Sequence, residues 1–218
     1  LVWIRGEGEY RLRDSRVHGW LSPRIWAAAA GVLVQSEVNR VDLLSELERV
    51  TPALVPSLRG KLTVVENGLD LPQATPVPTH GRVLSVGRLI ADKGMDVVIA
   101  ACALAGQPLT IAGAGPERAA LERLAARQGG DVRFAGYVDR AALAALYDES
   151  SCVVLASRRG EGLPNVLLEG MAHARPVVAT PCAGTRDLLA DGANGLLVSA
   201  DDVSALKSAL ERLAAEPA

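Results

Sequence analysis

Short apolar segments alternate with helical patterns through most of this chain, from residue 82 onward. The apolar segments start roughly 19 to 26 residues apart, which is the repeat length of a strand followed by a crossover helix. Strands that are apolar along their whole length are typical of a parallel sheet with helices on both faces. The pattern therefore predicts a doubly wound α/β domain. The predicted strands are residues 83–87, 109–113, 132–136, 152–157, 176–180 and 195–199, and the predicted helices are residues 95–104, 117–128, 140–148, 164–173 and 203–215.

The first 70 residues follow the same strand and helix alternation, but with too few units to close a doubly wound sheet. We expect strands at residues 1–4, 32–35 and 62–65, a helix over residues 10–30 that breaks near Pro23, and a helix capped by Ser36. Three prolines without periodicity indicate a linker over residues 71–80. The predicted organisation is a partial domain (1–70), the linker (71–80), a complete α/β domain (81–200) and a C-terminal helix (201–218).

Charge and composition exclude several classes of protein. With 23 Lys and Arg against 25 Asp and Glu, the chain lacks the basic excess of a nucleic-acid binder. No apolar stretch is long enough to span a membrane, so we expect a cytoplasmic protein, with peripheral contact at the inner membrane face left open. Cys102, Cys152 and Cys182 lie among apolar neighbours, which predicts buried, unreactive thiols. The opening inside an apolar run, without Met, suggests a truncated piece.

The segment after the predicted fourth strand carries the strongest chemical signal. In open parallel sheets ligands bind at the carboxyl ends of the strands, and a helix N-terminus there binds anions. Glu161 precedes such a helix and Glu169 lies on its second turn, so a diphosphate at the N-terminus would have one carboxylate toward each end. Carboxylates suit the vicinal hydroxyls of two sugars. The alternative is that Glu161 only complements the helix dipole and Glu169 is a solvated helix residue.

Two cations follow the predicted first strand of the domain. Arg88 and Lys93 could clamp a diphosphate, or they could be surface charges paired with Asp92 and Asp96. The segment that begins at Gly113 lacks the third glycine of a dinucleotide-binding fingerprint, which argues against an NAD enzyme. No metal-ligand spacing and no Ser/His/Asp arrangement is visible in the sequence.

In combination, these segments resemble the carboxyl-terminal domain of a retaining GT-B glycosyltransferase of family four, also called group 1. The motifs that carry the resemblance are the Glu pair at 161 and 169 and the Arg–Lys pair at 88 and 93. The similarity extends over residues 61–200. It implies two Rossmann-like domains, with residues 1–70 as the end of the acceptor-side domain and residues 81–200 as the donor-binding domain. The other matching segments are residues 86–88, 113–117, 134–138, 175–180 and 191–198.

The resemblance also implies roles for individual residues. Arg88 and Lys93 would contact the donor diphosphate, Glu169 the nucleotide ribose and Glu161 the transferred sugar. The family often has a His-Gly pair after the strand matching residues 1–4. Arg5 stands there in this sequence and is the second catalytic candidate. The remaining donor-binding candidates are Gly87, Gly113, Gly115, Tyr137 and Val138 (the last two beside the base), and Gly162, Leu163, Pro164 and Asn165 (backbone to sugar and phosphate).

The activity implied by the resemblance is transfer of a sugar from a UDP-, GDP- or ADP-linked donor, with retention of configuration. The acceptor would be a sugar or a lipid-linked sugar in polysaccharide or glycolipid biosynthesis, and neither a cofactor nor a metal would be required. The chain as it stands would bind donor but turn over little, because the family's catalysis uses a cleft between two domains. Two alternatives stay open: a non-catalytic nucleotide-sugar-binding module and a GT-B-type sugar-nucleotide epimerase. Apolar surface around Trp3, Trp20 and Trp26 predicts self-association.

Overall fold

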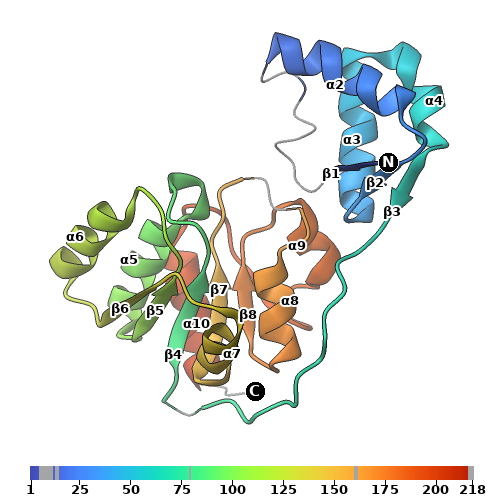
Figure 1. The fold of residues 1–218 in the computed structure, drawn as a ribbon. Coiled ribbons are helices and arrows are strands. Elements are labelled where there is room, and N and C mark those ends of the chain that lie inside the picture. Colours follow the sequence, from blue (N-terminus) through green and yellow to red (C-terminus); the bar gives the residue numbers. More distant parts are fainter. Residues whose placement is uncertain (5–11, 13–14, 79, 160–161, 216–218) are drawn as a thin grey trace. The chain divides into compact units, whose positions relative to one another are not determined.

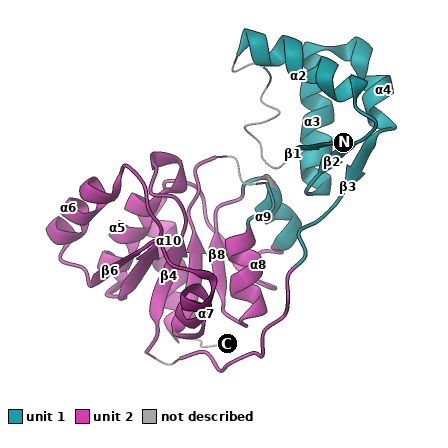
Figure 2. Cartoon of the chain, viewed as in Figure 1, with its two compact units in different colours: residues 1–68, 160–164, 182–188 teal, residues 69–159, 165–181, 189–218 magenta. Residues whose placement is uncertain are grey.

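The computed structural model describes residues 1–4, 12, 15–78, 80–159 and 162–215 (Figure 1). The chain divides into two compact units, which Figure 2 draws in two colours. The first unit comprises residues 1–68, 160–164 and 182–188, and the second comprises the remainder from residue 69 to the C-terminus. The first unit thus takes two short segments from the part of the chain that otherwise builds the second.

A six-stranded parallel sheet forms the centre of the second unit, with strand order β6-β5-β4-β7-β8-β9. The chain builds outward from β4 to β6, then returns so that β7 pairs with β4 on its other side. This is the predicted doubly wound arrangement, and each strand falls on an expected apolar segment. The strands are β4 (Arg82–Val86), β5 (Leu109–Ala112), β6 (Val132–Gly136), β7 (Ser150–Leu155), β8 (Val177–Ala179) and β9 (Leu196–Leu197).

Helices cover both faces of this sheet. On one face α5, α6 and α10 enclose an aliphatic core with Val83, Ile111 and Val154 of the strands. On the other face α7 and α8 lie together (Figure 1), and Gly170 of α8 sits directly over Val153 of β7. These helices are α5 (Met95–Ala105), α6 (Arg118–Gln128), α7 (Arg140–Asp148), α8 (Asn165–Ala172) and α10 (Val203–Ala215).

The first unit contains a three-stranded parallel sheet with order β1-β2-β3. Ser36 caps α3 as expected, because its hydroxyl accepts a hydrogen bond from the Asn39 amide at 3.1 Å. Trp26, Val34 and Leu47 are buried together in the core of this unit. The elements are β1 (Val2–Ile4), α2 (Arg16–Ala28), β2 (Val32–Val34), α3 (Glu37–Val50), η2 (Pro52–Leu54), α4 (Val55–Arg59), β3 (Leu62–Val64) and α9 (Ala183–Leu188).

Two expectations about the first unit are wrong. Helix α2 does not break near Pro23 but continues through it. Pro23 and Gly19 are both buried, and a Cβ at Gly19 would lie 2.4 Å from the Leu12 carbonyl oxygen. Burial of this face of the helix, which also includes Trp26, offsets the hydrogen bond that proline cannot donate. The second expectation placed Trp26 on an exposed apolar surface. Trp26 is instead 5% exposed and belongs to the core, whereas Trp20 is 59% exposed.

The cysteines differ in their surroundings. Cys102 and Cys152 are buried, and burial raises the pKa of the Cys152 thiol to about 12, so both thiols stay protonated near neutral pH. Cys182 is only half-buried, contrary to the expectation for all three. Among the described helices, none combines the length and apolar character needed to cross a membrane.

Candidate functional site

The predicted donor-binding loops of the second unit lie at one edge of its sheet. Every strand in the sheet is parallel to its neighbours, so the loops after β4, β5, β6 and β7 all leave from the carboxyl edge. The strand order reverses between β4 and β7, and a doubly wound sheet binds its ligand outside such a reversal point. The loops that follow these strands begin at residues 87, 113, 137 and 156.

Glycines allow the loops after β4, β5 and β6 to touch. A Cβ added at Gly113 would lie 1.8 Å from the carbonyl oxygen of Gly87, and one at Gly115 would lie 2.3 Å from that of Leu89. Gly113 has φ +145°, which disfavours any other residue, and its amide donates a 2.7 Å hydrogen bond to the Gly136 carbonyl. The structure thus brings Gly87, Gly113 and Gly115 together at the carboxyl edge, where their lack of side chains lets the loop backbones pack closely.

Both predicted diphosphate cations lie on the loop after β4. Arg88 is exposed, and Lys93 is half-buried at the end of the short helix η3 (Ala91–Lys93). The aliphatic stem of Lys93 passes 3.9 Å from the position that a Cβ on Gly87 would occupy. Lys93 therefore lies beside the carboxyl end of β4, where a diphosphate clamp would need it. Asp96, which the surface-charge alternative offered as a partner, forms an ion pair with Arg158 at 2.7 Å.

Arg158 fixes this cationic loop, and the sequence analysis did not single it out. Its guanidinium forms ion pairs with Asp96 and Asp201, at 2.7 and 2.6 Å, and donates a hydrogen bond to the Ala91 carbonyl. Its amide donates to the Asp92 carbonyl at 2.8 Å. The hydrogen bond to Asp96 raises the pKa of Arg158 above its ordinary value, so the side chain stays charged. These partners lie 43 to 67 residues away in the chain, a distance that no local pattern reveals.

Glu169 is held by a buried tyrosine. It lies half-buried on the second turn of α8, and the Tyr147 hydroxyl donates to its Oε2 at 2.8 Å. Burial raises the pKa of Tyr147 well above its ordinary value, so the hydroxyl keeps its proton and remains a donor. This contact argues against the alternative that Glu169 is simply a solvated helix residue. Asn165 is the exposed first residue of the same helix.

The loop immediately before α8 is packed within the first unit. Gly162, Leu163 and Pro164 are all buried. The Asn67 side-chain amide donates to the Leu163 carbonyl at 3.2 Å, and a Cβ at Gly184 on α9 would lie 1.4 Å from the Gly162 carbonyl oxygen. The sequence analysis predicted neither α9 nor this contact, which joins segments about 100 residues apart.

Of the four remaining predicted site residues, the structure describes two. Tyr137 is 85% exposed and Val138 half-buried, directly after β6 at the carboxyl edge. Glu161 and Arg5, the two catalytic candidates, lie outside the described residues. Across the described part of the chain, no cluster of His, Cys, Asp or Glu side chains is arranged to hold a metal ion.

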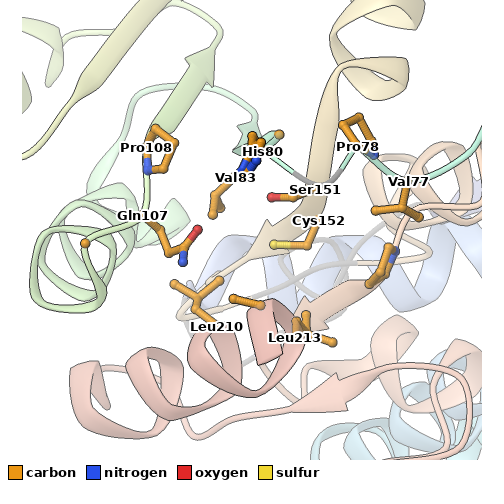
Figure 3. A pocket seen from close by; sticks show the side chains of 14 residues that line it. Val77, Pro78, His80, Val83, Gln107, Pro108, Ser151, Cys152, Leu210 and Leu213 are labelled. Atoms are coloured by element: carbon orange, nitrogen blue, oxygen red, sulfur yellow. The ribbon is translucent and has the colours of Figure 1, made fainter. Parts of the chain in front are cut away.

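A pocket of about 340 Å³ lies at the opposite, amino edge of the same sheet (Figure 3). Linker residues, the starts of β4 and β7, and Leu210 and Leu213 of α10 line it. None of the predicted donor-binding residues does so. Because ligands of doubly wound sheets bind at the carboxyl edge, we place the candidate site there and not in this pocket.

Comparisons with known proteins support the resemblance. The family model described as "Glycosyl transferases group 1" matches residues 80–216. The chain is 38% identical over 163 residues to the lipopolysaccharide core biosynthesis glycosyltransferase LpsE of Rhizobium meliloti, covering 72% of this chain and 45% of that protein. It is 30% identical over 214 residues to a glycogen synthase of Mycobacterium tuberculosis, covering 93% and 51%. The chain thus spans about half the length of these curated relatives.

The fold is similar to that of solved glycosyltransferases. A variant of S. aureus TarM, in complex with Fondaparinux, alpha-GlcNAc-glycerol and UDP, superposes with a TM-score of 0.82 at 19% identity, covering 98% of this chain and 43% of that one. This likeness confirms the expected GT-B-type α/β fold. The family match extends over well more than half of the sequence. The chain therefore belongs to the group 1 glycosyl transferases.

Proposed function

We propose that this chain forms the donor-binding part of a retaining glycosyltransferase. The donor is a UDP-, GDP- or ADP-linked sugar, and the acceptor is a sugar or a lipid-linked sugar. The observation that carries the proposal is the half-buried Glu169 carboxylate, held by Tyr147 on a helix that begins at the carboxyl edge of the sheet. A carboxylate fixed in this position is suited to accept hydrogen bonds from vicinal ribose hydroxyls.

The proposed chemistry is stabilisation of a departing nucleoside diphosphate. As the bond between the anomeric carbon and the phosphate oxygen breaks, negative charge grows on the diphosphate. Arg88 and Lys93 stabilise that charge, so no metal ion is needed. The acceptor hydroxyl oxygen bonds to the anomeric carbon as the diphosphate oxygen leaves it, the hydroxyl proton passes to the departing diphosphate, and configuration is retained. Glu161 holds the transferred sugar, and Arg5 is the second catalytic candidate.

The remaining donor contacts follow from the same arrangement. The glycine loops at Gly87, Gly113 and Gly115 let the backbone approach the diphosphate, and Tyr137 and Val138 border the base. The backbone of residues 162–165 contacts sugar and phosphate. Residues 81–200 form the donor-binding domain in this proposal, and residues 1–70 belong to the acceptor side. The name of the relative LpsE and the UDP in the TarM complex support the donor class and a role in polysaccharide or glycolipid biosynthesis.

Two proposals concern partners. The exposed apolar face of α2, which includes Trp20, mediates association with a second copy of the chain. Peripheral contact with a membrane surface would bring the protein to a lipid-linked acceptor.

Calorimetric titration with UDP, GDP and ADP tests the donor site. We expect one of the three to bind with a dissociation constant below about 1 mM. Glu169→Ala should weaken that nucleotide about tenfold, the loss expected when a charged hydrogen-bond partner worth about 1.4 kcal/mol is removed. Arg88→Ala and Lys93→Ala should each cause a similar loss, because each removes one diphosphate contact.

Matched controls separate these effects from general changes in charge. Glu149→Ala removes an exposed carboxylate that follows α7, and Arg133→Ala removes an exposed cation from β6. Both controls should bind nucleotide as the unmodified chain does. Absence of binding by all three nucleotides would overturn the donor-site proposal, and unchanged affinity in Glu169→Ala would overturn the ribose role.

A further inference from the structure

A chain of partly buried side-chain contacts connects Glu169 with the linker. The Tyr147 hydroxyl donates to Glu169 Oε2 at 2.8 Å, and the Tyr147 ring stacks on His173 with centroids 5.2 Å apart. Nδ1 of His173 donates to Oδ1 of Asp148 at 2.9 Å, and the Thr75 hydroxyl donates to the same oxygen at 3.0 Å. The contacts come from the end of α7, from α8 and the turn after it, and from the linker.

We propose that Tyr147 is a positioning residue for the donor site: it holds the Glu169 carboxylate in the orientation that accepts the ribose hydroxyls. This inference rests on the proposed ribose role of Glu169. Tyr147 acts through Glu169 and makes no contact of its own with the donor.

The geometry leaves Tyr147 little freedom. Its side chain is 1% exposed, and the imidazole of His173 lies nearly parallel to its ring, at 25°. The ring fixes the place of the hydroxyl oxygen, which lies 2.8 Å from Glu169 Oε2 and 3.5 Å from the Val166 carbonyl oxygen, so its closer contact is with Glu169. A glutamate that would otherwise sample several rotamers is restrained by this bond. The bond occupies one lone pair on Oε2, and a carboxylate has about four acceptor positions. Glu169 thus keeps the capacity to accept both ribose hydroxyls.

The restraint has a defined energetic consequence. Without it, the donor would have to order the Glu169 side chain on binding, at a cost of about 0.5–1.5 kcal/mol for a rotamer-rich side chain. Removal of the Tyr147 hydroxyl should therefore raise the dissociation constant of a ribonucleotide about 2- to 10-fold. The loss should be absent for a nucleotide that lacks the hydroxyls recognised by Glu169.

The experiment is a double-mutant cycle on nucleotide affinity. Tyr147→Phe, Glu169→Ala and the double variant are titrated with whichever of UDP, GDP or ADP binds the unmodified chain, and with its 2′,3′-dideoxy analogue. Tyr147→Phe removes one oxygen and keeps the ring that stacks on His173, and thermal unfolding is recorded alongside. We expect Tyr147→Phe to weaken the ribonucleotide 2- to 10-fold, with the dideoxy analogue unchanged. The double variant should match Glu169→Ala, because Tyr147 has no route to the donor except through Glu169.

The outcomes separate this inference from the function on which it rests. If Glu169→Ala leaves discrimination between the two nucleotides intact, the ribose role fails. If Glu169→Ala abolishes discrimination while Tyr147→Phe leaves it unchanged, the ribose role stands and the positioning role is overturned. Equal weakening of both nucleotides by Tyr147→Phe also overturns it, because a general loss of structure would act on both. If the losses of affinity in the two single variants add up in the double variant, the positioning role is overturned as well.

Discussion

A buried arginine holds the linker to the rest of the second unit. Arg175 is 2% exposed, and its guanidinium donates to the carbonyls of His173 at 2.8 Å and Pro76 at 3.1 Å, and to both the carbonyl and the hydroxyl of Thr75. Burial lowers its pKa, but an arginine remains charged at any pH of interest. Arg175 thus satisfies backbone carbonyls that extended chain leaves without a sheet partner.

Replacing Arg175 by lysine should destabilise the second unit. A single ammonium cannot reproduce the guanidinium fork, so buried carbonyls would lose their donors. We expect Arg175→Lys to reduce the free energy of unfolding by about 2 kcal/mol, measured by urea denaturation. The matched change Arg133→Lys, at an exposed position on β6, should stay within about 0.5 kcal/mol. Equal effects of the two substitutions would contradict the linker-anchoring role.

Asp148 should make part of the stability depend on pH. The hydrogen bond from His173 is the main cause that lowers the pKa of Asp148 below its ordinary value. A lowered folded-state pKa adds stability above the unfolded pKa of about 3.9, and this stability is lost as pH falls through the folded value. The side chain is 39% exposed, so solvent screening limits the contribution to about 0.5–1 kcal/mol.

Asp148→Asn tests this dependence. We expect the variant to be less stable than the unmodified chain at pH 5 to 7, and the difference to shrink as pH falls below about 4. Thermal unfolding over that range, followed by circular dichroism, measures it. A difference that is constant with pH would show that the ionisation of Asp148 contributes nothing.

At the scale of elements, α8 packs closely on β7. A Cβ at Gly170 would lie 2.9 Å from Cγ2 and 3.2 Å from Cβ of Val153, a buried and β-branched side chain. This approach fixes the depth of α8 on the sheet. Because Glu169 precedes Gly170, the same contact sets where the proposed ribose ligand stands.

Gly170→Ala should therefore be destabilising despite the better helix propensity of alanine. We expect an overpacking cost of about 1–3 kcal/mol, offset by about 1 kcal/mol of propensity. Val153→Ala removes the methyl groups that clash. The double variant should be more stable than the sum of the two single losses predicts, by at least about 0.5 kcal/mol. Additive losses in urea denaturation would refute the steric account.

At the scale of the whole molecule, the first unit carries an exposed apolar face on α2. Val17, Trp20, Leu21 and Ile25 are 42 to 71% exposed, and their spacing places them on one side of the helix. Apolar patches of this kind are typical of interaction surfaces. A charge placed within the patch should oppose its burial without disturbing the core, because these side chains are already in contact with solvent.

We expect the chain to self-associate as its concentration rises, and Ile25→Glu to shift the equilibrium toward monomer. Multi-angle light scattering across a concentration series measures the mean mass. The matched control is Val41→Glu on α3, also 50% exposed but outside this face. A monomer at every concentration would refute the association. An equal shift with the control would show that net charge alone is responsible.

Prediction from sequence succeeded where the controlling interactions are local. Apolar periodicity placed all six strands of the large sheet, and Ser36 was correctly predicted as a helix cap. The continuation of α2 through Pro23 and the short helix α9 were missed, because both depend on packing against distant segments. Tyr147 and Arg158 were missed as residues that hold the site, and Arg175 as the anchor of the linker, for the same reason.

The sequence alone determined the order of the six strands of the large sheet, the segments that carry Arg88, Lys93 and Glu169, and the family resemblance, since hydrophobic periodicity and motif spacing are properties of neighbouring residues. Only the tertiary structure decided what holds those residues. Glu169 meets Tyr147 across 22 residues of chain, and Arg158 meets Asp96 across 62. Such contacts exist only after the sheet has brought distant helices and loops together, so their energy belongs to the fold and not to any segment of the chain.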